Sequence, residues 1–421
     1  MGGWRDIPGK LSGRHTLARG AGGWRRPEVL LLIFAAAAPL SFSTWQALLN
    51  NFAIERAAFT GAEMGILQSL REVPGFLAFA VVYVLLLMRE QNLAVVSLVA
   101  LGLGTAATGF FPSVLGLYVT TVVMSIGFHY FYTLERSLTL QWIEKEHTPV
   151  IMGRMIAAAS MAAIVTFGLI WLAFDLAGLD FVWVYLIGGG ATVLMALLAW
   201  ALFPKFPEVV RQHRHMVLRR RYWLYYALSF MSGARRQIFI VFAGFLMVEK
   251  FDYLVEEITL LFLLNAVINI FLAPRIGRLI ARWGERRALI CEYIGLIGVF
   301  VAYAFVDNAA LAAGLYVVDH LFFAMAIAIE TYFQKIADRR DIAATAGVSC
   351  TINHIAAVVI PAAFGFVWLI SPAAVFLAGA AMAAVSLLLS LNVPARPQPG
   401  REVVWGRRLS GSAELGPEAV T

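Results

Sequence analysis

One run of polar residues recurs at the spacing of an α-helix, with steps of 4, 3 and 4 positions. Its members are Ser125, His129, Tyr132 and Arg136. Because an α-helix has about 3.6 residues per turn, all four side chains share one face. A hydroxyl, an imidazole, a phenol and a guanidinium in one stripe can hydrogen-bond a polar solute and balance a negative charge on it. We therefore predict that this face binds substrate.

A second run has the same spacing and carries two carboxylates. It consists of Asp319, Phe323, Ala326 and Glu330. The periodicity predicts that Asp319 and Glu330 share a helix face. Because carboxyl groups in apolar surroundings can exchange protons near neutral pH, we predict that both are proton carriers. Glu135, which lies off the first stripe and points toward a neighbouring helix or the cytoplasmic mouth, is a third candidate for this role.

A third segment contains two adjacent arginines that a helix would point in different directions. Arg236 shares a narrow sector with Ser229 and other small or polar residues, whereas Arg235 points about 100° away. We predict that Arg236 faces a cavity and binds substrate, and that Arg235 pairs with a carboxylate. Three further residues in apolar segments are candidate substrate ligands. They are Trp45, Asn265 and Asn353.

The elements that carry these residues are long and apolar. Apolar residues make up 61% of the 421 positions and charged residues only 14%, against about 25% in soluble domains. A bilayer core about 30 Å thick needs about 20 apolar residues per helix. The sequence therefore predicts an all-α integral membrane protein with twelve transmembrane helices. Their ranges are 29–50, 63–88, 92–111, 113–139, 151–174, 181–203, 222–248, 255–276, 288–306, 310–335, 343–370 and 372–392.

The basic residues predict how the chain is oriented. With both termini in the cytoplasm, nearly all Lys and Arg outside the spans fall in cytoplasmic segments, and only Arg56 and Lys250 fall on the other side. The net charge of +7 is thus an orientation signal and not evidence of a nucleic-acid partner. Arg71 and Glu72, which precede Pro74, are predicted to form a structural pair near the outer face. We expect a bacterial inner membrane, with the lipid bilayer as a partner.

The chain divides into two equivalent parts, because a basic segment separates the first six spans from the last six. The letters "GLYV" occur at Gly116 in the fourth span and again at Gly314 in the tenth. Paired six-helix repeats are typical of transporters. We predict a cytoplasmic tail at 1–28, a six-helix bundle at 29–203, a cytoplasmic linker at 204–221, a second six-helix bundle at 222–392 and a disordered cytoplasmic tail at 393–421.

The most specific motif is "GRLIARWGERRAL", between the eighth and ninth spans. It resembles the loop signature of the major facilitator superfamily, which runs Gly-x-Leu-x-Asp-Arg-x-Gly-Arg-Lys/Arg. The signature positions retained here include Gly277, Arg282, Gly284 and Arg286. Ala281 stands where the acidic residue is expected, and Glu285 where a base is expected. We expect the glycines to permit a tight turn and the arginines to hold it at the cytoplasmic face.

The resemblance implies the fold of that superfamily, in which spans 1, 4, 7 and 10 line a central cavity. It implies a secondary active transporter that moves a small polar solute by alternating access. Arg236 and Arg136, two cations expected to face the cavity, favour an anionic or zwitterionic solute. The candidate carboxylates favour coupling to protons. No nucleophile elbow, zinc-protease helix or Walker loop occurs, so we expect neither an enzyme nor a cofactor. We expect a monomer.

Two alternatives stay open from the sequence. In the first, the protein transports a divalent metal, because imidazoles and carboxylates in the spans could coordinate one. These residues are His129, Asp319, His320, Glu330 and His354. In the second, the protein is a non-transporting assembly factor or sensor that has kept the fold. The many charges within the spans argue against this second alternative, because such charges are costly to retain.

Overall fold

The computed structural model describes residues 24–143, 147–207, 219–338 and 342–405. These residues form helices joined by short turns, and the one β contact among them is an isolated bridge between Gln398 and Arg401. The α-helices are α1 (Pro27–Ala57), α2 (Gly61–Phe76), α3 (Val81–Val84), α4 (Glu90–Thr108), α5 (Val114–Trp142), α6 (Thr148–Asp175), α7 (Phe181–Leu202), α8 (Trp223–Phe251), α9 (Val255–Trp283), α10 (Glu285–Ala304), α11 (Ala309–Phe323), α12 (Ile327–Ile336), α13 (Ile342–Ile370) and α14 (Pro372–Leu391). Three-residue 3₁₀ helices are η1 (Ala78–Ala80), η2 (Arg220–Tyr222) and η3 (Ala324–Ala326).

Eleven helical segments of the described chain are long and apolar enough to cross a membrane. The predicted second span, at 63–88, is the exception, because it is not one helix. It consists of α2, then η1 and α3. The break follows Pro74 and Gly75, the residue types that most weaken a continuing helix. The all-α fold predicted from the sequence is confirmed, and this span is corrected to a broken one.

The predicted tenth span is also interrupted. It consists of α11 and α12 with the 3₁₀ segment η3 between them. A 3₁₀ helix turns about 120° per residue, against about 100° in an α-helix, so three such residues rotate the following helix by about 60°. This rotation matters for the second polar stripe, whose members lie on both sides of η3.

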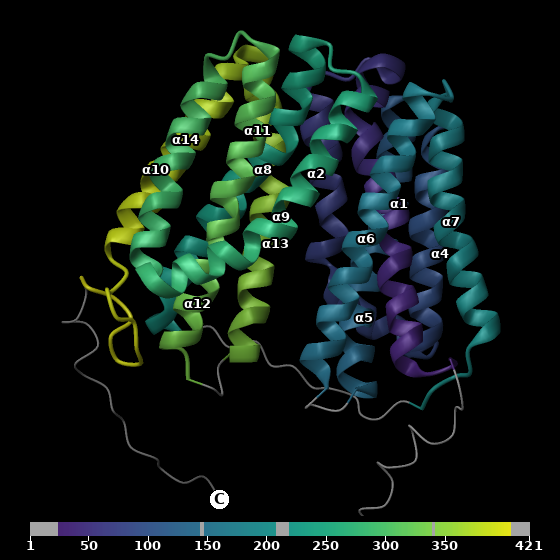
Figure 1. Cartoon of the computed structure of the whole chain (residues 1–421), viewed down its shortest axis with the longest axis horizontal. Coiled ribbons are helices and arrows are strands. Elements are labelled where there is room, and N and C mark those ends of the chain that lie inside the picture. Colours follow the sequence, from purple (N-terminus) through teal and green to yellow (C-terminus); the bar gives the residue numbers. More distant parts are fainter. Residues whose placement is uncertain (1–23, 144–146, 208–218, 339–341, 406–421) are drawn as a thin grey trace, which may run out of the picture.

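The helices pack as two groups, the N-half (α1 to α7) and the C-half (α8 to α14), which Figure 1 shows side by side. In the N-half, α1 packs on α6 and α7, and α4 packs on α5 and α7. In the C-half, α10 packs on α11 and α14, and α14 packs on α8. The two halves meet mainly where α2 packs on α13 and where α6 packs on α9. This arrangement agrees with the predicted pair of six-helix bundles.

Glycines let α2 and α13 come close together. A methyl group on Gly65 would lie 2.2 Å from the carbonyl oxygen of Pro361, and one on Gly61 would overlap the ring of Trp368. The Ala362 amide donates a hydrogen bond of 2.9 Å to Ser69 Oγ across the same contact. The two halves are therefore in backbone contact along this seam.

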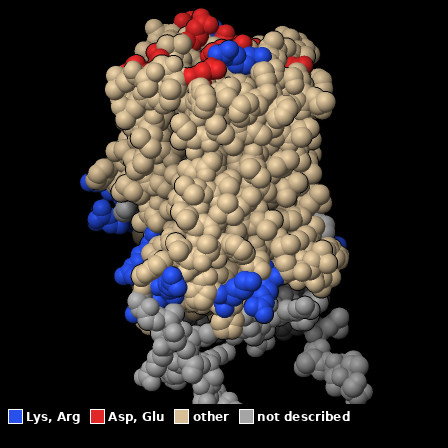
Figure 2. All heavy atoms as spheres, turned by 90° about the vertical axis from the view of Figure 1, so that its right-hand side faces the viewer, with Lys and Arg blue, Asp and Glu red and all other residues tan. Residues whose placement is uncertain are grey.

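The two ends of the molecule carry opposite charge. Figure 2 shows Lys and Arg gathered at one end, here called the basic end, and Asp and Glu at the other, the acidic end. Arg56 and Lys250, the two basic residues expected on the far side, form ion pairs of 2.7 Å with Asp180 and Asp307 respectively. The segregation of charge is what the positive-inside rule requires of a membrane protein.

The C-terminal region departs from the prediction of a disordered tail at 393–421. Residues 393–405 are ordered against the C-half: Val393 is fully buried, and Trp405 N donates to Asn392 Oδ1 at 2.6 Å. Tyr332 Oη in α12 donates to the carbonyl of Glu402. The rest of this tail, most of the tail at 1–28 and most of the linker at 204–221 lie outside the described residues.

Candidate functional site

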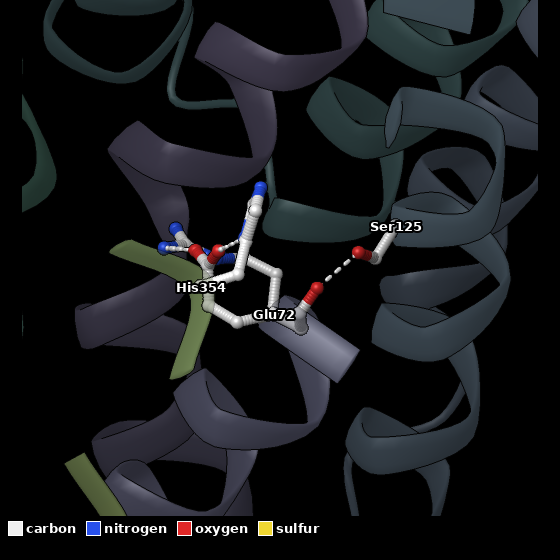
Figure 3. Close-up of polar contacts among 4 residues, drawn as sticks. Glu72, Ser125 and His354 are labelled. Carbon is white, nitrogen blue, oxygen red and sulfur yellow. Dashed lines mark hydrogen bonds and ion pairs between the residues drawn. The ribbon is translucent and has the colours of Figure 1, made fainter. Parts of the chain in front are cut away.

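A charged cluster joins the two halves in the interior of the molecule. Glu72 of α2 lies with its Oε2 atom 3.2 Å from Nδ1 of His354 on α13. The other oxygen of Glu72 pairs with the guanidinium of Arg71. Ser125 of α5 donates a hydrogen bond to the backbone carbonyl of Arg71, so that α5 fixes the position of the pair (Figure 3). We call Arg71, Glu72, His129 and His354 the seam cluster.

The fourth member, His129 of α5, stands next to His354. The two imidazole rings are 5.3 Å apart in an edge-to-face arrangement. Gly75 makes room for them, because a methyl group there would lie 2.5 Å from one ring and 2.6 Å from the other. Arg71 lies 5.7 Å above the ring of Trp45, an arrangement typical of a cation–π contact.

The seam cluster lies near the middle of the membrane, and this corrects the prediction that Arg71 and Glu72 lie near the outer face. Glu72 lies eleven positions after Gly61, where α2 begins at the acidic end. At about 1.5 Å per residue this is roughly 16 Å, or half of a 30 Å bilayer core. The span predicted at 63–88 begins close to the same point, but the sequence did not reveal that α2 packs on α13.

Arg236 of α8 lies near this cluster. It is exposed, although it lies midway along a membrane-spanning helix. It interacts electrostatically with Arg71, Glu72 and Asp319, and its guanidinium lies 5.3 Å above the ring of Phe323. Because charge is costly in lipid, an exposed arginine among ionisable groups indicates an aqueous cavity.

Other predicted ligands are exposed as well. Asn353 is exposed on α13, and its Oδ1 atom would lie 2.6 Å from a methyl group on Gly233 of α8. Tyr132 and Arg136, the two members of the first stripe nearest the basic end, are exposed on α5. Exposure agrees with their predicted role as substrate ligands. Ser125, in contrast, is buried and committed to the Arg71 carbonyl.

Arg235 has a different environment from its neighbour, as the helical faces predict. Its Nη2 atom lies 3.1 Å from Glu292 Oε1, and its Nη1 atom donates to Ser386 Oγ at 3.0 Å. Both charged side chains are almost completely buried inside the C-half. Sequence analysis missed Glu292, although a carboxylate within the predicted span 288–306 was a usable signal.

The two carboxylates of the second stripe lie in different environments, and the single α-helix on which their expected shared face depends is interrupted between them. Asp319 is buried, its Oδ1 atom has no hydrogen-bond partner among the described residues, and it interacts electrostatically with Arg235 and Arg236. Glu330 is exposed and accepts a hydrogen bond of 3.4 Å from Tyr225. The reason is the 3₁₀ segment η3, which rotates α12 relative to α11.

Several predicted residues have a buried polar atom with no hydrogen-bond partner among the described residues. Such atoms are rare in folded proteins and often mark functional positions. In this structure they include Oε1 of Glu135, Oγ of Ser229, Nε1 of Trp45, and both amide atoms of Asn265.

The five residues of the metal alternative do not come together as one site. Within the described part of the chain, no three His, Cys, Asp or Glu side chains lie close enough to hold a metal ion. His129 and His354 are neighbours, whereas His320 hydrogen-bonds to the carbonyl of Tyr316 on its own helix. The geometry therefore gives no support to metal transport.

The signature loop is only partly as predicted. Gly284 makes the turn between α9 and α10 with a φ of 81°, a conformation that favours glycine. Gly277 lies within α9, so its predicted part in the turn is wrong: α9 continues to Trp283. Glu285 is buried and forms a 2.5 Å ion pair with Lys335 at the end of α12, which ties the loop to the C-half. Arg282 is exposed and Arg286 half-buried.

These features define a polytopic helical membrane protein of the transporter type, with two helical halves and a charged site between them. The sequence profile of the Major Facilitator Superfamily matches residues 29–361, and the chain belongs to this superfamily. No curated protein matches the chain significantly.

Solved transporter structures share the fold. A mutant form of the nucleoside transporter NupG is 13% identical, with a TM-score of 0.71 over 87% of this chain and 99% of that one. A bacterial homologue of the human lysosomal transporter Spinster, inward-facing and occupied, is 13% identical, with a TM-score of 0.66 over 86% of this chain and 95% of that one. At such identity the likeness concerns the fold alone.

Proposed function

We propose that this protein is a proton-coupled secondary transporter for a small polar solute that carries a negative charge, either an anion or a zwitterion. The observation that carries the proposal is the charged site between the halves. Arg71, Glu72 and His129 from the N-half and Arg236 and His354 from the C-half lie near the middle of the membrane. A site at the interface of two repeats is where alternating access can expose a solute to either side.

The charge of the site supports the choice of solute. Arg71 is already engaged by Glu72, whereas Arg236 forms no ion pair with a described residue and is exposed to the cavity. Its guanidinium can bind a carboxylate or phosphate in a bidentate manner. Asn353, Tyr132 and Arg136, all exposed, supply further donors. Trp45, Ser125, Ser229 and Asn265 are assigned to shaping the site.

The contacts between the halves support a conformation that is closed at the acidic end. Asn51, near the end of α1, donates to the carbonyl of Tyr253 at 2.7 Å, and the rings of Phe167 and Phe262 are 5.7 Å apart. These residues lie toward the acidic end of their helices, as does the Gly61 contact with Trp368. With the basic end in the cytoplasm of a bacterium, as the positive-inside rule favours, this conformation is inward-facing.

We assign proton binding to carboxylates that lack a strong hydrogen-bond or ion-pair partner among the described residues. Asp319 is buried without a hydrogen bond to Oδ1, and Glu135 is buried without one to Oε1, each among the described residues. Glu330 is exposed, and its hydrogen bond with a described residue is the 3.4 Å contact from the hydroxyl of Tyr225. A carboxyl group in such a place can gain and lose a proton as the cavity opens and closes.

Electrical recording from proteoliposomes on a solid support tests the proposal by comparing solutes of different charge. The panel contains anionic, zwitterionic, neutral and cationic solutes, applied with and without a pH gradient. We expect transport currents with anionic or zwitterionic solutes, and an apparent affinity lowered about 10- to 100-fold in Arg236→Gln, as for loss of one charged hydrogen bond.

Arg278→Gln is the matched control, because Arg278 is an exposed arginine of α9 at the basic end and outside the site. It should keep the affinity of the original protein. Currents with cationic solutes alone, or an affinity that Arg236→Gln leaves unchanged, would contradict the proposed site.

A further inference from the structure

Of the contacts between an acidic and a basic side chain among the described residues, that of Glu72 with His354 is the one that joins the halves, and it is an ion pair when the imidazole carries a proton. The other described pairs lie within one half. The contacts of α2 with α13 at Ser69, Gly65 and Gly61 lie nearer the acidic end, and Gly75 lies against the His354 ring on the other side of Glu72. The pair therefore lies within the closed seam.

Movement of α2 away from α13 breaks this pair, because its two members lie on these two helices. The α2 and α13 backbones touch through glycines at Gly61, Gly65 and Gly365, and such contacts carry no charge and few directional bonds. Most of the described polar bonding across the seam thus comes from Glu72 with His354 and from the Ala362 amide with Ser69. Of these two contacts, only the first contains titratable groups.

Among the described residues, the charged and titratable groups around His354 come from three helices. From α2, Glu72 faces it directly and Arg71 lies behind that carboxylate. From α5, His129 packs against its ring. From α8, Arg236 interacts electrostatically with Arg71 and Glu72, and Glu249 bonds Trp368 farther along α13, toward the acidic end. Helix α14, which also packs on α13, has no titratable residue.

We propose that His354 is a proton site that holds the seam shut: its charged imidazole bonds Glu72 and keeps α2 against α13, and loss of the proton frees the acidic end to open. The proposal rests on the proton coupling of the proposed function. A charged hydrogen bond is about twice as strong as a neutral one, so deprotonation weakens this contact. Glu72 then keeps its bond to Arg71 on its own helix, and the charged link to the other half is lost.

The proposal gives a direction to the coupling. A proton taken up from the acidic side would close that side, and release of the proton to the basic side would let the acidic side reopen. The test of this proposal needs no solute, so its result is independent of the transport assay. The seam can fail to respond to pH in a protein that transports, and it can respond before the solute is known.

Distances between spin labels measure the opening of the acidic end. Cysteines replace Glu55 in α1 and Ile370 in α13, both exposed at that end, in a chain whose own cysteines are removed by Cys291→Ala and Cys350→Ala. The protein is held in lipid nanodiscs between about pH 6 and about pH 8.5, a range that spans the titration of an imidazole. We expect the ratio of long to short distances to rise about tenfold with pH.

Three variants decide the assignment. His354→Asn should give the long distance at every pH, and His354→Arg, with its permanent charge, should give the short distance at every pH. His320→Asn is the matched control, because the described hydrogen bond of this histidine is to the backbone of its own helix, and it should titrate like the original protein. An unchanged pH response in His354→Asn, or a normal opening at high pH in His354→Arg, would overturn the proposal.

Discussion

Two charged clusters of this protein each contain an arginine and a glutamate. They differ in whether their side chains come from one half of the molecule or from both. The pair of Arg235 and Glu292 lies within the C-half, with side chains only 1% and 0% exposed. The seam cluster lies between the halves, and its side chains in ion pairs are 10% to 21% exposed. The first cluster can stay intact while the halves move, whereas the second must change its bonds. Similar chemistry therefore serves stability in one place and switching in the other.

The largest effect is expected at the buried pair. Arg235→Gln leaves Glu292 buried without a cationic partner, and we expect the free energy of unfolding to fall by about 3 to 5 kcal/mol. Thermal unfolding in detergent measures it. Arg236→Gln is the control and should unfold at nearly the original temperature, because Arg236 is exposed and forms no ion pair with a described residue. If the two variants are equally stable, the contrast between the clusters is lost.

Asp319, which interacts electrostatically with Arg235, extends the buried cluster of Arg235 and Glu292, and it tests whether this cluster also takes part in coupling. Asp319→Asn keeps the shape of the side chain and removes its proton, so proton-driven accumulation should be lost while exchange of solute across the membrane continues. Uptake and exchange in proteoliposomes, measured with a solute found by the electrical screen, separate the two activities. Accumulation at the original level in Asp319→Asn would confine this cluster to a structural role.

The smallest effect is expected for an exposed ion pair, which supplies the baseline for the comparison. Arg56 and Asp180 are about half exposed at the acidic end. Exposed pairs contribute about 0 to 1 kcal/mol, and salt screens them. Arg56→Gln should therefore leave the unfolding temperature nearly unchanged in the same detergent assay. If Arg56→Gln lowered the unfolding temperature as much as Arg235→Gln does, the contribution of these ion pairs to stability would not depend on their burial.

Much of the fold was predictable because its signals are local. Apolar length determines where helices cross a membrane, basic loops determine which ends lie together, and a period of 3.6 residues separates the faces of Arg235 and Arg236. The direction in which Arg236 points could also be predicted, from the small and polar residues, such as Ser229, that share its helix face. The same reasoning failed for the stripe from Asp319 to Glu330, because it assumes an unbroken α-helix and η3 interrupts it.

The sequence by itself determined that this chain is an α-helical membrane protein of two halves with charges inside. Only the tertiary structure decided which charges meet. Glu72 and His354 are 282 positions apart, and Arg235 and Glu292 are 57 apart. No periodicity relates residues at such separations. Their meeting depends on how α2 packs on α13 and how α8 packs within the C-half, and those contacts are selected by glycines, side-chain volumes and buried bonds that act across the whole fold.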